Sequence, residues 1–137
     1  MQDPAKEARE DYNKIGRIWS VALNDYISFN NVGFQHLIRK GKAPRSPRQQ
    51  IKRLTLIPYA TEVILKPSQP VTLREEEKYS PIKRDGIEMM INTHVRFWAF
   101  HANIENKNIR VIVRQINNGH KHFFSIFEED KQKRPRE

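Results

Sequence analysis

The residues of this chain that could do acid–base chemistry near neutral pH are its histidines. The five histidines are His36, His94, His101, His120 and His122. His36 stands out because Arg39 and Lys40 follow it within about one helical turn. An imidazole beside cations could take a proton from a hydroxyl group while the cations hold a phosphate.

A metal site is the alternative use of histidine, and the segment His120-Lys121-His122 is its candidate. Neighbouring positions of a strand point to opposite faces, and no carboxylate motif completes a ligand set. The chain has no cysteine, which excludes a thiolate nucleophile, and it has no glycine-rich loop that would cradle a phosphate. We therefore expect neither a metal nor a cofactor.

The first half of the chain must position His36, and its patterns predict helices. Apolar residues recur at helical spacing over residues 5–23, which predicts an amphipathic helix. Residues 27–29 are predicted to be a short strand or an extended connector. Residues 34–40 are predicted to form a brief helical turn that Gly41 closes.

Prolines divide the segment that follows. Ser46 before Pro47 predicts the cap and the first turn of a second helix. Pro58 predicts a break in that helix, after which it restarts and continues to Leu65. Residues 68–81 are predicted to be an exposed connection.

After Gly86 the chain is rich in β-branched and aromatic residues, with polar turns between the runs. The predicted strands cover residues 87–91, 95–102, 109–116 and 122–127. This order indicates an α+β fold, with N-terminal helices packed on one face of a C-terminal antiparallel β-meander. We expect residues 1–137 to form a single basic domain with frayed tails at about 1–4 and 130–137.

Asn118-Gly119 is typical of a two-residue hairpin turn and sets a register for the last two predicted strands. The register places arginines and aromatic residues together on one face: Arg110, Ile112, Arg114, Phe123, Ser125 and Phe127. The face toward the helices would hold Val111, Val113, Phe124 and Ile126, with Gln115 and His122 at its rim.

A second turn at Asn106-Lys107 would place His101 opposite Ile112. Phe97 and Ala99 would then join the face of the arginines, and Trp98 and Phe100 would join the core. Cations interleaved with aromatic rings can hold phosphates and stack bases. The alternative is that these rings cover a second packing partner.

Positive charge is concentrated in one interval of the chain. There are 25 Lys and Arg against 16 Asp and Glu, which gives a net charge of +9 and a pI near 10. No acidic residue lies between Asp25 and Glu62, which favours a phosphate-binding surface over a merely solvated helix and loop. The predicted RNA-binding residues are Arg39, Lys40, Lys42, Arg45, Arg48, Lys52, Arg53, Lys121 and Phe123.

Three segments resemble motifs of the barnase–EndoU–colicin–RelE (BECR) superfamily of small ribonuclease toxins, especially its colicin D-like and phage-associated branches. They are Phe34 to Lys40, Arg110 to Arg114 and His122 to Phe127. The resemblance implies a metal-independent endoribonuclease in which a histidine of the helical part faces a serine and basic residues of the last strands. Here these residues are His36, Lys40, Arg114 and Ser125. The chain departs from the pattern because His101 competes for the role of general base.

We expect from these observations a toxin-type endoribonuclease that cleaves RNA, with tRNA favoured, and leaves a 2′,3′-cyclic phosphate. His36 or His101 would take the proton of the 2′-hydroxyl group. Arg110 and Arg114 would stabilise the charged transition state, and Ser125 would position a phosphate oxygen. Such a toxin acts in the cytoplasm, can be delivered into a target cell as part of a larger protein, and would need an acidic immunity protein or antitoxin.

The rival expectation is a non-catalytic RNA- or DNA-binding accessory module, for instance of a phage, conjugation or RNA-processing protein. The histidines would then be incidental. A third expectation is a protein-interaction domain with an acidic partner. No apolar run approaches the roughly 20 residues that a bilayer span needs, so we expect no membrane partner.

Overall fold

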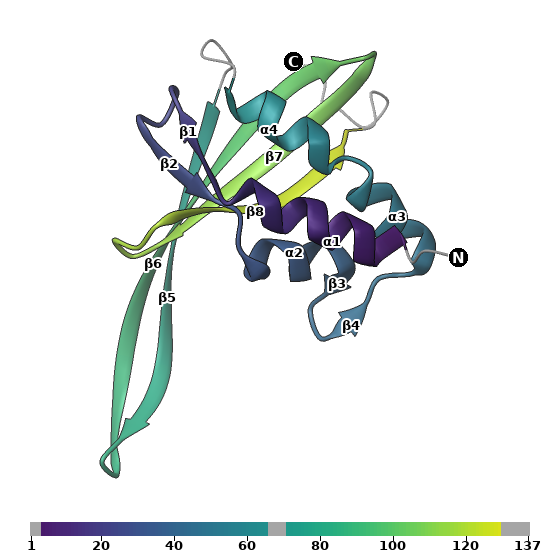
Figure 1. The fold of residues 1–137 in the computed structure, drawn as a ribbon. Coiled ribbons are helices and arrows are strands. Elements are labelled where there is room, and N and C mark those ends of the chain that lie inside the picture. The colour runs from purple at the N-terminus through teal and green to yellow at the C-terminus, as the bar shows by residue number, and fades with distance from the viewer. Residues whose placement is uncertain (1–3, 66–70, 130–137) are drawn as a thin grey trace.

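Helices dominate the first half of the chain and a sheet the second, which confirms the predicted α+β fold (Figure 1). The computed structural model describes residues 4–65 and 71–129. The helices are α1 (Pro4–Ile15), α2 (Asn31–Ile38), α3 (Pro47–Leu54) and α4 (Ile57–Leu65). The strands are β1 (Arg17–Ser20), β2 (Asp25–Ser28), β3 (Arg39–Lys40), β4 (Ala43–Pro44), β5 (Val71–Arg84), β6 (Ile87–Ile104), β7 (Lys107–Ile116) and β8 (Lys121–Glu128). The predicted tails lie outside the described residues, except that Pro4 begins α1.

The helix predicted over residues 5–23 ends at Ile15, so the second half of that prediction is wrong. Gly16 adopts the left-handed backbone conformation, with φ of +67°, which ends a helix at little steric cost. The chain then turns into β1, which pairs antiparallel with β2, and Trp19 packs edge-on against Tyr26. β1 and the turn after it therefore take the place of the helix's last two turns.

The capping residues of the next two helices follow from the sequence. Asn30 accepts a hydrogen bond from the Gly33 N–H, so α2 begins earlier than the predicted residue 34. Ser46 accepts from the Gln49 N–H at 3.2 Å, which confirms the predicted start of α3. The predicted break in the helix is confirmed, but α4 already starts at Ile57, before Pro58 and not after it, because proline is tolerated in a first turn.

The sheet has six strands in the order β1-β2-β8-β7-β6-β5 (Figure 1). The four strands from β5 to β8 form an antiparallel meander, as predicted for the second half of the chain, although β5 was not among the predicted strands. β2 pairs parallel with β8 only at Ile27 and Ser28, which lie beside Lys121 and His122. The rest of that edge of β8 lies against α2, where Gly33 packs on the backbone of Phe123.

Two predictions about the segment before the meander are wrong. Residues 68–81 were expected to be an exposed connection, but 71–84 form β5, which pairs with β6 along its whole length; residues 66–70 lie outside the described residues. The strands predicted at 87–91 and 95–102 are parts of the single long strand β6. β5 lacks an apolar alternation because it is an exposed edge strand, held by cross-strand contacts such as the 3.1 Å pair of Glu75 and Arg96.

The register between β6 and β7 differs from the prediction, but the faces do not. The turn lies at Glu105 and Asn106, both with positive φ, and it sets His101 opposite Arg110 instead of Ile112. The partner therefore changes by two positions, and a change of two positions returns every side chain to the same face. Phe97 and Ala99 accordingly share the face of the arginines, as predicted.

The register between β7 and β8 is confirmed in one half and wrong in the other. Ile112 lies opposite Ser125 and Arg110 opposite Phe127, as predicted. A bulge at Ile112/Val113 then shifts the pairing, so that Val113 lies opposite Phe123. The shift arises because the strands end at Ile116 and Lys121, which leaves a longer loop than Asn118-Gly119 alone.

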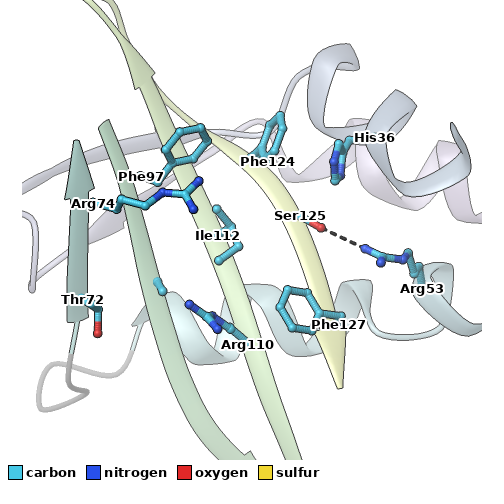
Figure 2. Close-up of a pocket in the computed structure, with 11 residues that line it drawn as sticks. His36, Arg53, Thr72, Arg74, Phe97, Arg110, Ile112, Phe124, Ser125 and Phe127 are labelled. Carbon is cyan, nitrogen blue, oxygen red and sulfur yellow. Dashed lines mark hydrogen bonds between the residues drawn. The ribbon is translucent and has the colours of Figure 1, made fainter. Parts of the chain in front are cut away.

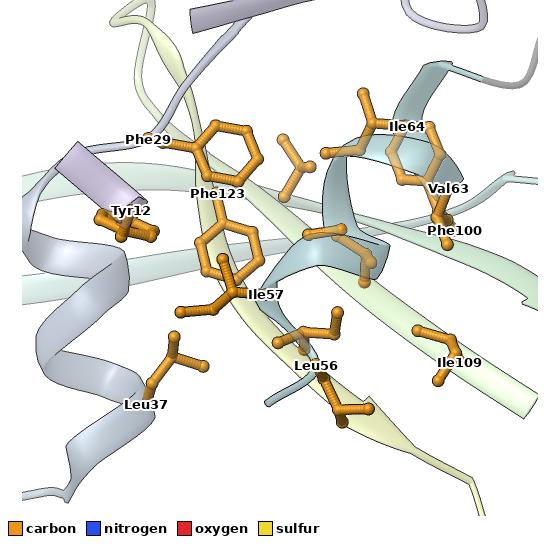
Figure 3. Close-up of a cluster of buried hydrophobic side chains, with 14 of the residues drawn as sticks. Tyr12, Phe29, Leu37, Leu56, Ile57, Val63, Ile64, Phe100, Ile109 and Phe123 are labelled. Carbon is orange, nitrogen blue, oxygen red and sulfur yellow. The ribbon is translucent and has the colours of Figure 1, made fainter. Parts of the chain in front are cut away.

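The core lies between the helices and one face of the sheet (Figure 3). Phe123 is fully buried there, stacked on Phe29 with ring centroids 4.9 Å apart, so the bulge exchanges the predicted places of Phe123 and Phe124. Tyr12 is also fully buried, and its hydroxyl donates to the Asn30 carbonyl at 2.6 Å. The remaining large members of the cluster include Leu37, Ile57, Val63, Ile64, Phe100, Ile109, Val111, Val113 and Ile126.

Candidate functional site

A cavity of about 270 Å³ lies on the face of the sheet that the core does not use (Figure 2). Its walls come from β5 to β8 and from α2 and α3, which reach it past the edge of β8. The lining residues are His36, Arg53, Thr72, Arg74, Phe97, Ala99, Arg110, Ile112, Phe124, Ser125 and Phe127. None of them is acidic, so the cavity suits an anion.

His36 reaches the cavity because α2 packs tightly on β8. A Cβ atom at Gly33 would lie 2.3 Å from the carbonyl oxygen of Phe123, so only glycine permits this approach. His36 follows one turn later, and its ring lies with its centroid 4.2 Å from that of Phe124. The glycine thus determines how far the imidazole extends over the sheet.

The surroundings of His36 keep its ring neutral. Burial is the largest cause that lowers the pKa of His36, the nearby charges of Arg45, Arg53 and Arg114 add to it, and together they bring the pKa to about 4. Its Nδ1 atom is buried and has no hydrogen-bond partner among the described residues. A neutral imidazole keeps one nitrogen as an acceptor, and the ring lines the cavity, so it could take a proton from a ligand there.

Two guanidinium groups approach one ring from different elements. Arg53 of α3 and Arg110 of β7 each lie 5.8 Å from the ring centroid of Phe127. Arg53 also donates to the Ser125 hydroxyl at 3.0 Å, so Ser125 and the arginine face the same space (Figure 2). Both guanidiniums line the cavity, so they favour an anion there.

Aromatic rings form the opposite side of the cavity (Figure 2). Phe97 and Phe124 pack edge-to-face with centroids 5.9 Å apart, and Arg74 lies 4.8 Å from the ring centroid of Phe97. Arg74 and Thr72 come from β5. The cavity therefore has a cationic part near Phe127 and an aromatic part near Phe97.

Arg114 was predicted to be catalytic, but it does not line the cavity. Its guanidinium lies 4.4 Å from the ring centroid of Phe124, and its Nε donates to Nε2 of His122 at 3.0 Å. Burial lowers the pKa of His122, and the Arg114 charge adds to this effect, so His122 is a neutral acceptor. Arg114 thus lies behind Phe124 and contributes positive potential to the site.

His101, the second candidate base, lies outside the cavity lining. Its Nδ1 is 3.5 Å from the Glu129 carboxylate, which also lies 3.4 Å from Arg110. The structure therefore brings His36, Arg110 and Ser125 together, but not His101.

The predicted RNA-binding residues fall into three groups. Arg39, Lys40, Lys42, Arg48 and Lys52 are exposed on the β3–β4 hairpin and on α3. Arg45 and Arg53 lie beside His36, and Arg45 donates to the His36 carbonyl at 3.2 Å.

The third group does not face a ligand. Lys121 pairs with Asp25 at 2.7 Å, and Phe123 is buried in the core. The predicted contact of Phe123 with RNA is thus wrong, because the bulge turns that ring to the helices.

Sequence reasoning missed Thr72, Arg74 and Phe124. The first two lay in the predicted connection, although Val71-Thr72-Leu73-Arg74 alternates apolar and polar residues and could have indicated a strand. Nothing local predicts the bulge that brings Phe124 to the cavity. Arg53 was predicted to bind the RNA backbone, and it lines the cavity.

Comparisons with models of protein families, with curated proteins and with solved structures found no match to this chain. Within residues 4–65 and 71–129 there is no group of three or more acidic, histidine or cysteine side chains that could hold a metal ion. No helix in the same ranges is long and apolar enough to cross a membrane.

Proposed function

We propose that this protein is a metal-independent endoribonuclease of the toxin type, with its active site in the cavity at His36. The observation that carries the proposal is the combination of a neutral imidazole, two guanidiniums and a hydroxyl that line one cavity. RNA supplies both groups that this set fits: a phosphodiester and an adjacent 2′-hydroxyl group.

Phosphate binding comes first in the proposed reaction. A phosphodiester in the cavity would pair with the guanidiniums of Arg53 and Arg110, and Ser125 would donate to a phosphate oxygen. The base of the bound nucleotide would stack against the aromatic part of the cavity near Phe97 and Phe124. Stacking would hold the ribose so that its 2′-hydroxyl group faces His36.

The chemical step is a transesterification. His36 takes the proton of the 2′-hydroxyl group, and the 2′-oxygen bonds to phosphorus. The bond from phosphorus to the 5′-oxygen breaks, which leaves a 2′,3′-cyclic phosphate and a 5′-hydroxyl group that takes a proton from water. Arg53 and Arg110 stabilise the charge on the phosphorane oxygens, and the field of Arg114 adds to theirs.

Cleavage of RNA in EDTA tests the proposal. Purified protein is incubated with total tRNA and with a mixed-sequence RNA, and the ends of the fragments are identified. We expect cyclic-phosphate ends, at least a 1000-fold loss of rate for His36→Ala, and a loss of about 10- to 100-fold for Ser125→Ala. His101→Ala is the matched control, because His101 lies outside the cavity and should retain most activity.

A non-catalytic RNA-binding module is the rival function, and the exposed cations on the β3–β4 hairpin and α3 would serve it equally well. The same variants separate the two. Under the proposal, His36→Ala still retains RNA in a shift assay but no longer cleaves it. Intact RNA at high protein excess, together with retention of RNA, would replace the nuclease with the binding module.

A further inference from the structure

β5 and β6 continue beyond the sheet as a two-stranded arm, which projects away from the helices (Figure 1). β6 pairs with β7 only from Val95 onward, so residues 87–94 pair with β5 alone. We define the arm as residues 77–84 together with residues 87–94. At about 3.3 Å per residue it is about 25 Å long.

The arm exposes large apolar side chains along its length. They are Tyr79, Ile87, Met89, Met90 and Ile91, and Ile87 and Met90 are each 63% exposed. A two-stranded ribbon alone in water is marginally stable, and contiguous apolar surface marks an interaction site. Adjacent methionines suit such a surface because their flexible side chains adapt to a partner.

The exposed apolar side chains of the arm divide between its two faces, with Tyr79 and Met90 on one face and the others on the opposite face. Ile82 pairs with Met89, and Arg84 pairs with Ile87, and paired residues share a face. Since side chains alternate along a strand, Ile91 lies on the same face as Met89, while Met90 lies on the other. Ile82, Ile87, Met89 and Ile91 therefore form an apolar stripe on one side of the arm.

Charge indicates that the stripe binds protein and not RNA. Residues 77–94 contain three acidic and three basic residues, so the arm is formally neutral in a chain of net charge +9. A surface that grips RNA needs an excess of cations. The outer edge of β5 is also a poor place to add a strand, because Pro81 has no N–H to donate there. A partner would therefore cover a face of the arm and not its outer edge.

We propose that this partner is a second copy of the chain and that the stripe is the interface of a homodimer. Glu76 and Arg84 lie on the face of the stripe, one at its base and the other at its tip. Two arms stacked antiparallel about a two-fold axis would place each Arg84 beside the Glu76 of the other copy. Glu76 is partly exposed beside Arg74, at 3.3 Å, and can also accept a second cation.

The arrangement also keeps the strongly basic parts of the two copies apart. Arg39, Lys40, Lys42, Arg48 and Lys52 lie on the hairpin β3–β4 and on α3, which the arm projects away from (Figure 1). Repulsion between two chains of charge +9 therefore acts over a longer distance than it would in a side-by-side dimer.

Sedimentation equilibrium over a range of protein concentrations tests the proposal. We expect a monomer–dimer equilibrium, and the double variant Met89→Thr/Ile91→Thr should raise the dissociation constant at least tenfold. Met90→Thr is the matched control, because it removes a methionine of similar exposure from the opposite face and should leave the constant unchanged. Circular dichroism would verify that each variant remains folded.

Charge reversal tests the antiparallel arrangement. Arg84→Glu and Glu76→Arg should each weaken self-association, whereas an equal mixture of the two variants should form a heterodimer with both contacts restored. A chain that stays monomeric at every concentration would overturn the proposal, and so would a dimer that only Met90→Thr disrupts. Neither outcome depends on whether the protein cleaves RNA.

Discussion

At the scale of single residues, the state of His36 is the feature that matters most for chemistry. Burial and the charges of Arg45, Arg53 and Arg114 lower its pKa to about 4, so the ring is neutral at physiological pH. A bound phosphodiester would bring negative charge among those arginines. The pKa of His36 would therefore be lowered less in the complex with RNA than in the free protein.

This difference predicts two separate pH profiles. The rate constant kcat/KM reports the free enzyme, so it should rise with pH and level off above about pH 4. The acid limb of kcat reports the complex and should lie at higher pH, because the phosphate raises the pKa of His36. Steady-state cleavage of a short RNA from pH 3.5 to 8 measures both. A kcat/KM limb near the ordinary histidine value of about 6.5 would contradict this electrostatic argument.

At the scale of elements, the contact between α2 and β8 positions the candidate base. Gly33 allows the helix backbone to lie against the Phe123 carbonyl, and the bulge in β8 sends Phe123 to the core and Phe124 to the cavity. The helix and the bulge therefore act together on the two sides of one strand. Neither the helix contact nor the bulge would by itself place His36 over Phe124.

Gly33→Ala should destabilise the protein because the new methyl group would clash with backbone, which cannot move aside cheaply. We expect the free energy of unfolding to fall by about 3 kcal/mol, measured by urea denaturation. Val32→Ala is a suitable control on the same helix, because Val32 is 48% exposed and should change stability by less than about 0.5 kcal/mol. A neutral effect of Gly33→Ala would mean that α2 lies farther from β8.

At the scale of the whole molecule, charge is unevenly distributed. The exposed cations on the β3–β4 hairpin and on α3 flank the side on which His36 lies, whereas the arm is formally neutral. RNA held by the first surface would release counterions, so its affinity must fall as the salt concentration rises.

The salt dependence of RNA binding identifies the cations that take part. Lys52→Gln should lower the slope of log K against log salt concentration by about 0.7, the contribution of one contact to single-stranded nucleic acid. Lys121→Gln should leave the slope unchanged, because Lys121 already pairs with Asp25. Binding titrations of His36→Ala with a short RNA, at several salt concentrations, would measure these slopes without cleavage. Equal slopes for the two variants would mean that RNA binds at a surface that does not include Lys52.

The sequence by itself determined the α+β class, the start of α3, and the alternation of faces along the meander. These features depend on local patterns: a capping serine before proline, and a period of two residues in each strand. Alternation also tolerates an error of two positions in the partner of His101, since both registers leave that residue on the same face. Arg110 and Ser125 could be named as candidates for this reason, and His36 could be named from the cations that follow it.

Only the tertiary structure decided which candidates meet. Arg53 reaches Ser125 across 72 positions of the chain, and Thr72 and Arg74 line the cavity from a strand whose charged sequence does not resemble one. The bulge that exchanges Phe123 and Phe124 arises from the pairing of two strands and has no signature in either strand alone. Such contacts depend on how whole elements pack, which a local pattern does not record.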